Sequence, residues 1–206
     1  AGAPYSYFYP YCLPDKSKCH VGLEEGILGE YLTDRLTEEA VSFIKSHSEG
    51  PFFLHLSHHA VHTVLQAPDS LINKYRNKTP GKYHKNPIYA AMIEKLDDSV
   101  DRICQVIKTL GIADRTIVIF YSDNGGSEPV TDNYPLNGGK GMPYEGGSRV
   151  PLIIRWTGKI EGGIRSSVPI TGVDFYPTFV TLAQGKIPAN LDLSLIHISE
   201  PTRRRG

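Results

Sequence analysis

The segment that decides the fold is PIYAAMIEKLDDSVDRICQVIKTLGIADRTIVIFYSDNGG, residues 87–126. Its first part predicts an amphipathic helix over Pro87–Leu110, because apolar residues recur there at alternating spacings of four and three. Asn86 stands at the N-cap position and Gly111 just past the end, as helix termini favour. The run that follows, Thr116–Tyr121, is continuously β-branched and aromatic, which is typical of a strand covered on both faces in a parallel sheet.

Helices and strands are predicted to alternate on either side of this segment. Helices are expected at Thr33–His47, after Pro68 and at Asp174–Ala183, and strands at Phe52–Ser57 and Val150–Trp156. The expected N-caps of the first and last of these helices are Thr33 or Asp34, and Asp174. Residues 5–29 show no period and are expected to be irregular surface chain. The alternation indicates an open α/β sheet, whose chemistry lies in loops beyond the carboxyl ends of the strands.

Composition narrows the class of protein. The chain has 206 residues, in which 22 Lys plus Arg balance 22 Asp plus Glu, and this excludes collagen, coiled coil and wholesale disorder. Zero net charge leaves no electrostatic footprint for nucleic acid or an anionic membrane, and no apolar run approaches the roughly 18 residues of a spanning helix. Residues 1–10 lack the pattern of a signal peptide. Cys12 and Cys19 could pair across a short loop in an oxidising compartment, so the compartment stays open.

Polar residues directly follow the strand predicted to end at Tyr121. Asp123 and Asn124 supply a carboxylate and an amide oxygen, which are the hard ligands that Ca²⁺ and Mg²⁺ prefer. The glycines after them allow the backbone to turn sharply around an ion. Asp-Asn-Gly is equally a turn signature, so the residues alone leave both interpretations open.

Three histidines, His58, His59 and His62, follow the predicted strand at Phe52–Ser57. The spacing of the outer two suggests zinc, but the zinc protease motif needs Glu at the second position and no third ligand is evident, so zinc is rejected. A single histidine at a strand end is usually a hydrogen-bonded structural residue. Three at the functional edge of a sheet favour at least one that contacts an anion or transfers a proton.

A glycine-rich loop, Ser122–Arg149, links the strands predicted at Thr116–Tyr121 and Val150–Trp156, and a loop of that length is usually functional or disordered. Lys140 is flanked by glycines, so its ammonium can approach a phosphate or sulfate closely; the alternative is a solvated loop charge. The surrounding sequence does not match the P-loop motif. For Arg149 we expect an ion pair with Glu145 or Asp174 rather than a role in substrate binding.

Three blocks in this order resemble hallmark blocks of the arylsulfatase-type sulfatases: PFFLHLSHHAVHTVLQAP (Pro51–Pro68), IVIFYSDNGG (Ile117–Gly126) and GGKGMPYEGGSRVPLIIRW (Gly138–Trp156). Two further stretches resemble the same family, YLTDRLTEEAVSFI (Tyr31–Ile44) and VDFYPTFVTLA (Val173–Ala183). The resemblance implies an alkaline-phosphatase-like α/β/α sandwich, here incomplete and limited to the second half of the catalytic domain.

The family resemblance also implies roles for individual residues. Asp123 and Asn124 match metal ligands that hold Ca²⁺. His62 matches the histidine that contacts the sulfate and assists the leaving group, and Lys140 matches the lysine that binds the sulfate and can protonate the departing oxygen. The implied protein is a sulfuric ester hydrolase that uses Ca²⁺ and a formylglycine made from Cys or Ser. Its expected partner is a sulfated small molecule or glycan, and its expected location is periplasmic or secreted.

One hallmark of the family is missing. Its earlier block, a pair of Asp residues followed by C/S-x-P/A-x-R, has no counterpart in this chain. The nearest match is Cys12-Leu13-Pro14-Asp15-Lys16, which ends in Lys where the family has Arg. We interpret this partial match as coincidence. We therefore expect an internal fragment, inactive by itself, with the nucleophile upstream of Ala1. Residues 1–30 are expected to be an irregular segment from within the domain of the parent enzyme, and residues 31–192 a partial sulfatase catalytic domain.

The end of the chain has a different expected origin. Residues 193–203, LSLIHISEPTR, resemble the translation of a sequencing-library adapter, so residues 193–206 are interpreted as an adapter-derived tail. The alternative is a natural apolar strand followed by a basic tail. In the adapter interpretation, His197 and the arginines at positions 203–205 carry no function.

Two rival functions stay open at this point. One is a phosphoesterase or phosphonate hydrolase of the same superfold, with a different nucleophile. The other is a non-catalytic domain that binds a sulfated glycan through Lys140 and His62. The sequence gives no indication of substrate identity or oligomeric state.

Overall fold

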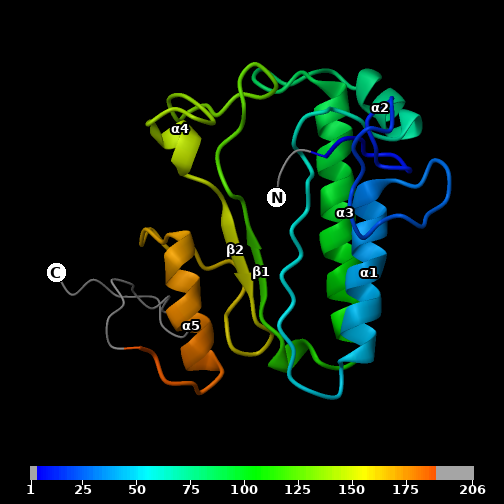
Figure 1. Cartoon of the computed structure of the whole chain (residues 1–206). Coiled ribbons are helices and arrows are strands. Elements are labelled where there is room, and N and C mark those ends of the chain that lie inside the picture. The colour runs from blue at the N-terminus through cyan, green and yellow to red at the C-terminus, as the bar shows by residue number, and fades with distance from the viewer. Residues whose placement is uncertain (1–3, 189–206) are drawn as a thin grey trace. The chain divides into compact units, whose positions relative to one another are not determined.

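The structure, a computed structural model, describes residues 4–188 and divides in sequence into two compact units, with the boundary between Ile154 and Arg155 (Figure 1). Among the described residues, no helix combines the length and the apolar character that a bilayer crossing needs. The predicted tail, residues 193–206, lies outside them. The elements, in order, are α1 (Leu32–Ser46), α2 (Asp69–Arg76), α3 (Pro87–Thr109), η1 (Ala113–Arg115), β1 (Val118–Tyr121), α4 (Glu145–Ser148), β2 (Leu152–Arg155), η2 (Gly172–Asp174) and α5 (Phe175–Leu182).

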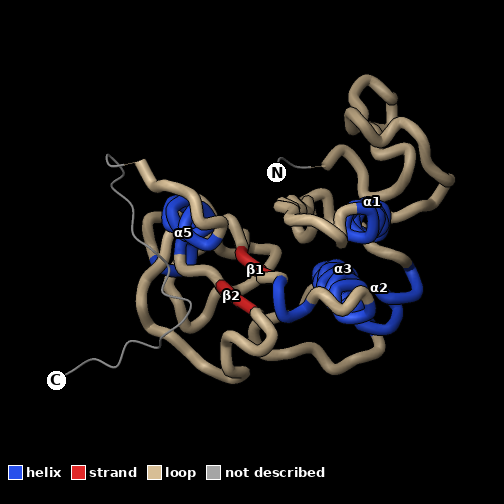
Figure 2. The backbone as a smooth tube through the Cα atoms, turned by 90° about the horizontal axis from the view of Figure 1, so that it is seen from below, coloured by secondary structure: helices blue, strands red, loops and turns tan. Residues whose placement is uncertain are grey.

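Helices α1 and α3 lie side by side in the first unit (Figure 2). Both were predicted from the spacing of apolar residues; the span predicted for α1 is shifted by one residue at both ends, and the span predicted for α3 is one residue too long at its C-terminal end. The start of α3 is capped as expected, because the side chain of Asn86 accepts hydrogen bonds from the backbone N–H groups of Ile88 and Tyr89 at 3.0 and 3.1 Å. The short helix expected after Pro68 is α2.

The N-cap predicted for α1 is wrong, and the one predicted for α5 is right in position but makes no side-chain cap. Helix α1 begins without a side-chain cap, and Thr33 and Asp34 lie inside its first turn, where Asp34 pairs with Lys95 at 2.6 Å. In the second unit, the turn η2 precedes α5 and has its N-cap at Thr171. Its backbone N–H donates to the Asp174 carboxylate at 2.9 Å, and its side chain accepts in return. Asp174 thus holds the N-cap position of α5, as predicted, but its side chain makes no cap hydrogen bond to α5 and belongs instead to the reciprocal cap of η2.

The sheet of the described residues has two strands, β1 and β2, next to each other. The buried strand predicted at Phe52–Ser57 does not form: the segment belongs to no β-ladder, and the Phe53 side chain is 70% exposed. A strand forms where a neighbour exchanges ladder hydrogen bonds with it, and Phe52–Ser57 belongs to no β-ladder of the described residues. The residues of β1 and β2 are only partly buried. The prediction that these strands are covered on both faces is therefore wrong.

A hydrophobic cluster joins the helices to β1. Phe52 and Leu54, on alternate residues of the extended segment, pack against the cluster, which explains why this segment has the composition of a strand. Through this cluster, the extended segment and β1 are both anchored to α1 and α3. The three histidines follow the segment, and Asp123 follows β1. The buried members of the cluster are Val41 and Ile44 of α1, Val106 and Ile107 of α3, and Ile112.

The first thirty residues contribute to the core, contrary to the surface location predicted for residues 5–29. Tyr7 and Tyr11 are fully buried, and the Tyr7 ring stacks on that of Tyr31 at 5.7 Å between centroids. The segment contains no helix or strand, as predicted, and a disulfide between Cys12 and Cys19 closes its loop. Apolar periodicity could not reveal this burial because an irregular segment has no period.

Candidate active site

The turn that carries His62 is held by a buried tyrosine. The backbone N–H of His62 donates to the carbonyl of His59 at 2.8 Å, which closes a turn directly after the extended segment. The Tyr7 hydroxyl donates to the His59 carbonyl at 2.8 Å and lies 3.0 Å from the His62 carbonyl. Because Tyr7 is fully buried, its hydroxyl is a fixed point to which the backbone of this turn is attached. No feature of the sequence indicates this role for Tyr7.

The hydrogen bonds of His62 define its tautomer. Its Nδ1 lies 2.6 Å from the carbonyl oxygen of Thr63, and a carbonyl can only accept, so Nδ1 carries the proton. In the neutral ring, Nε2 then presents a lone pair. The Nζ of Lys140 lies 3.1 Å from this Nε2 and donates to it. The structure thus brings together the two residues that the sequence assigned to sulfate binding and catalysis.

Lys140 is positioned by backbone contacts within the glycine-rich loop. Its backbone N–H donates to the carbonyl of Gly126 at 2.9 Å. The side chain of Asn133 supports the same point: it accepts from the N–H of Gly126 at 2.9 Å and donates to the carbonyls of Gly126 and Gly138 at 3.0 and 3.1 Å. Asn133 therefore ties the residues after β1 to the turn that carries Lys140. Sequence reasoning missed it, since a loop asparagine gives no signal of such a bridging role.

Glycines allow two segments of the glycine-rich loop to approach each other closely. The N–H of Gly125 donates to the carbonyl of Gly147 at 2.9 Å. A Cβ at Gly125 would overlap the carbonyl of Gly146, and a Cβ at Gly146 would overlap the carbonyl of Gly138. The loop was expected to be functional or disordered, and it is a folded unit built on backbone contacts that any larger residue would break.

Asp123 and Asn124 occupy the turn directly after β1. Asp123 is exposed, and the side-chain N–H of Asn124 donates to the carbonyl of Gly125 at 3.0 Å, which orients the amide. The Ser122 hydroxyl donates to the carbonyl of Asn124 at 3.0 Å and tightens the turn. These oxygens fit the chemistry of Ca²⁺, but two side chains supply only part of the six to eight ligands that it takes. No group of three or more His, Cys, Asp or Glu side chains in residues 4–188 is arranged to hold a metal.

The other two histidines have different surroundings from His62. The Nε2 of His58 lies 2.9 Å from the Ser99 hydroxyl on α3, and burial, with a smaller effect of His59, lowers the pKa of His58 to about 4. The ring of His59 contacts the ring of His20, with centroids 4.5 Å apart. His58 is thus a partly buried residue whose ring contacts α3, while the Nε2 of His62 accepts a hydrogen bond from Lys140. That at least one of the three contacts an anion or transfers a proton stays a prediction, and His62 is the one placed beside Lys140.

Arg149, at the end of the glycine-rich loop, makes the ion pair expected for it. Its Nη1 lies 3.3 Å from the Glu145 carboxylate on α4, and both side chains are about two-thirds exposed. Such an exposed pair contributes little to stability.

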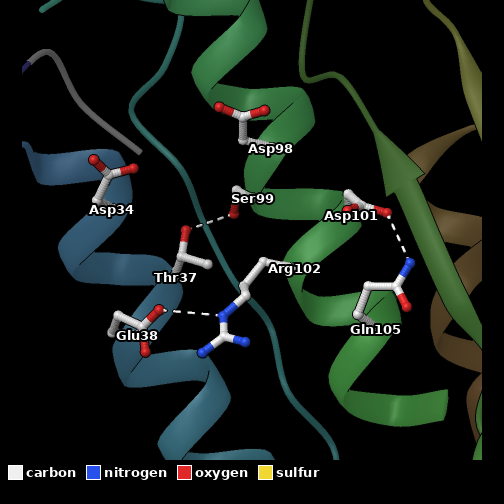
Figure 3. A pocket seen from close by; sticks show the side chains of 8 residues that line it. All are labelled: Asp34, Thr37, Glu38, Asp98, Ser99, Asp101, Arg102 and Gln105. Carbon is white, nitrogen blue, oxygen red and sulfur yellow. Dashed lines mark hydrogen bonds and ion pairs between the residues drawn. The ribbon is translucent and has the colours of Figure 1, made fainter. Parts of the chain in front are cut away.

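A surface groove of about 410 Å³ lies between α1 and α3 (Figure 3), and neither His62 nor Lys140 is among the residues that line it. Its polar groups already bind one another: Thr37 donates to Ser99 at 2.6 Å, and Arg102 to Glu38 at 3.4 Å. The lining carries the carboxylates of Asp34, Glu38, Asp98 and Asp101 against the single cation of Arg102. This negative lining would repel a sulfate ester, so the groove is not the candidate site.

Comparison with known proteins identifies the family. A family model described as Sulfatase matches residues 3–186. This chain belongs to the sulfatase family. It is 39% identical over 172 residues to a sulfatase of Formosa agariphila, covering 78% of this chain and 31% of the relative. It is 34% identical over 166 residues to human steryl-sulfatase, covering 76% of this chain and 27% of the relative. The sulfatase chain thus spans about a third of the length of these relatives.

Solved structures support the fold. The crystal structure of Ps i-CgsB in complex with k-i-k-neocarrahexaose matches with a TM-score of 0.76 and 37% identity, covering 85% of this chain and 39% of that one. The crystal structure of PsFucS1 sulfatase from Pseudoalteromonas sp. matches with a TM-score of 0.68 and 29% identity, covering 82% of this chain and 34% of that one. The predicted fold class, a partial α/β domain of the alkaline-phosphatase-like sulfatase type, is confirmed.

Proposed function

We propose that this sulfatase chain provides the sulfate-binding and proton-transferring part of a sulfuric ester hydrolase. The observation that carries the proposal is the contact of 3.1 Å between Lys140 Nζ and His62 Nε2. The ammonium supplies a positive charge for the sulfate oxygens. The histidine beside it can accept and return a proton.

The two side chains act together when the ester bond breaks. A nucleophile from outside this chain forms a bond to sulfur while the S–O bond to the leaving group breaks, and the electron pair of the broken bond remains on the departing oxygen. A proton moves from Lys140 Nζ to that oxygen, which removes the developing charge. The neutral ring of His62 accepts a hydrogen bond from the ammonium through Nε2, and the Thr63 carbonyl keeps Nδ1 protonated and the ring in this orientation. His62 thereby holds Lys140 at the sulfate and contacts the leaving group beside it.

Asp123 and Asn124 would hold Ca²⁺ through one carboxylate and one amide oxygen, together with ligands from residues beyond this chain. When bound there, the ion would polarise the sulfate. The nucleophile in this proposal is a formylglycine, made from Cys or Ser, that also lies beyond this chain. Cys12 is not a candidate for it, because its sulfur is bonded to Cys19.

The proposed substrate class is a sulfated glycan. The related protein Ps i-CgsB was crystallised with k-i-k-neocarrahexaose, an oligosaccharide, at 37% identity to this chain. We further propose that the enzyme is exported, to the periplasm or out of the cell. The disulfide between Cys12 and Cys19 supports export, because such bonds persist in oxidising compartments.

An assay with two matched esters tests this function. A full-length enzyme containing this chain is expected to hydrolyse p-nitrophenyl sulfate much faster than p-nitrophenyl phosphate. The reverse preference would favour the phosphoesterase alternative, and a phosphonate ester is the third substrate to compare. Binding of a sulfated glycan through Lys140 and His62 without turnover of any sulfate ester would favour the non-catalytic alternative.

A further inference from the structure

The balanced charge of the whole chain hides a local imbalance. No Asp or Glu occurs between Asp69 and Glu94, although the chain as a whole has as many acidic as basic residues. Within that interval, the end of α2 and the connection to α3 carry five cations: Lys74, Arg76, Lys78, Lys82 and Lys85. This connection has a strong positive potential that the net charge does not reveal.

Most of these cations are not neutralised by the protein. Lys74 pairs with Glu94 at 2.6 Å. The other four are exposed, and none of them forms an ion pair with an acidic side chain within residues 4–188. Lys78 and Lys82 lie over tyrosine rings, at 4.8 Å from the centroid of Tyr75 and 5.0 Å from that of Tyr83. Their ammonium groups are therefore available to an anion from outside the chain.

The basic connection docks onto the glycine-rich loop that carries Lys140 (Figure 1). The ring of Tyr83 stacks on that of Tyr134, with centroids 4.4 Å apart and an interplanar angle of 15°. Next to this stack, His84 Nδ1 lies 3.2 Å from the Thr131 hydroxyl. The Tyr134 side chain is 62% exposed, so an aromatic surface remains open beside the cations.

A short path of hydrogen bonds connects this docking point to Lys140. Tyr134 follows Asn133, whose side chain bonds to both N–H and carbonyl of Gly126. The same carbonyl accepts from the backbone N–H of Lys140 at 2.9 Å. The aromatic stack and Lys140 are thus attached to one rigid turn rather than to independent loops.

We propose that Lys78, Lys82, Lys85, Tyr83 and Tyr134, here named the basic aromatic surface, bind a second sulfated sugar unit of the substrate. The proposal rests on the proposed function and specifies its substrate as a glycan with more than one sulfate group. An exposed aromatic ring packs against the C–H groups of a sugar face, and lysines as point charges suit sulfate oxygens. A monosulfated small molecule held at Lys140 has no second sulfate group to offer these lysines.

The test is binding of defined oligosaccharides to the 206-residue chain, measured by fluorescence anisotropy at low salt. The probes are a labelled galactan hexasaccharide with three sulfate groups, its desulfated form, and single-stranded DNA with the same number of negative charges. Lys82→Ala and Tyr134→Ala are each expected to weaken binding of the trisulfated probe about fivefold, the size of one exposed charge or aromatic contact. Tyr134→Phe keeps the ring and should bind like the wild type.

Lys45→Ala is the matched control, because Lys45 is an exposed lysine near the end of α1 and its removal changes the net charge equally. Equal weakening by Lys45→Ala, equal binding of the desulfated probe, equal affinity for the DNA, or no binding of the trisulfated probe would each overturn the proposal. If Tyr134→Ala melts at a much lower temperature than the wild type, Lys82→Ala decides the matter, since the Lys82 side chain is exposed.

Turnover of p-nitrophenyl sulfate by the full-length enzyme separates this proposal from the proposed function. Lys82→Ala should leave kcat and KM for this small ester unchanged, while KM for the sulfated hexasaccharide rises. If the small ester is not hydrolysed but hexasaccharide binding still depends on Lys82 and Tyr134, the proposed function fails and the binding surface stands. If the small ester is hydrolysed and neither substitution affects the hexasaccharide, the binding surface fails.

Discussion

The Nζ of Lys140 lies 3.1 Å from the Nε2 of His62, although 78 residues separate them in sequence. The contact joins the turn after the extended segment to the glycine-rich loop after β1. Each partner is fixed separately, His62 through the Tyr7 hydroxyl and the Thr63 carbonyl, and Lys140 through the carbonyl of Gly126. Such preorganisation is what electrostatic catalysis requires, because the charge is in place before the reaction begins.

Replacing either partner of this contact should reduce turnover. In the full-length enzyme, Lys140→Ala and His62→Ala are each expected to lower kcat for p-nitrophenyl sulfate by on the order of a hundredfold or more, the usual loss for one charge-stabilising or proton-transferring group. Arg149→Ala is the control in the same loop, because Arg149 pairs only with exposed Glu145 among the described residues. Unchanged turnover in Lys140→Ala would contradict the assigned role.

Tyr7→Phe should act on His62 from a distance. The substitution removes the hydroxyl that binds the carbonyls of His59 and His62, with a cost of about 1–2 kcal/mol in unfolding free energy. We expect a moderate fall in kcat and a shift in the NMR signal of the His62 ring as the turn loosens. Tyr9→Phe is the matched control, since the Tyr9 hydroxyl donates to the exposed Glu24 carbonyl. A loss of stability with an unchanged His62 signal would show that Tyr7 is structural only.

The calcium site should be incomplete in this chain. Asp123 and Asn124 provide too few oxygens for tight binding, so calorimetry on the 206-residue chain is expected to show only weak affinity for Ca²⁺. In the full-length enzyme, Asp123→Ala should lower activity through loss of the ion, with partial recovery at high Ca²⁺ concentration. Submicromolar affinity of the 206-residue chain for Ca²⁺ would mean that the site is elsewhere.

The close packing of the glycine-rich loop predicts that Gly146→Ala is damaging. The new methyl group would overlap the carbonyl of Gly138 and displace the turn before Lys140. We expect about 1–3 kcal/mol of destabilisation, the usual cost of overpacking, together with reduced turnover. Gly50→Ala is the control, because a Cβ there meets nothing within 4 Å. Equal effects of the two substitutions on urea unfolding would argue against the tight approach.

The sequence predicted the elements whose signals are local. The helix α3 and its Asn86 cap follow from apolar spacing and a capping residue, which depend on neighbours in the chain. The strand predicted at Phe52–Ser57 failed because pairing depends on a second segment, which the pattern cannot supply. The burial of Tyr7 and Tyr11 was missed for a related reason, since their partners in the core are distant in sequence.

The candidate site, too, has residues that the sequence singles out and features that depend on packing. Residue type and family resemblance singled out His62, Lys140, Asp123 and Asn124. Which histidine is buried depends on packing, however, and so does the bridging role of Asn133. The charge pattern of residues 74–85 is visible in the sequence, but its proximity to the Lys140 loop is visible only through the stacking of Tyr83 on Tyr134.

The last prediction concerns stability at mildly acidic pH. Burial, with a smaller effect of the nearby His59, lowers the pKa of His58 from 6.5 to about 4. Between these values the unfolded chain binds a proton at this residue and the folded chain does not, so the unfolding free energy must fall as the pH falls. The contribution is intact above about pH 6.5 and is lost progressively down to about pH 4, with roughly 2 kcal/mol lost between pH 7 and pH 5.

Urea unfolding of the wild type and of His58→Gln at pH 7 and pH 5 measures this contribution. Glutamine can still bind the Ser99 hydroxyl but does not titrate, so the variant should lose less stability than the wild type over this interval. Part of the pH dependence should remain in the variant, because burial also lowers the pKa of His20. The same loss of stability in both proteins would show that His58 is not buried as a neutral ring, because only a group whose pKa differs between the folded and unfolded chain can produce the difference.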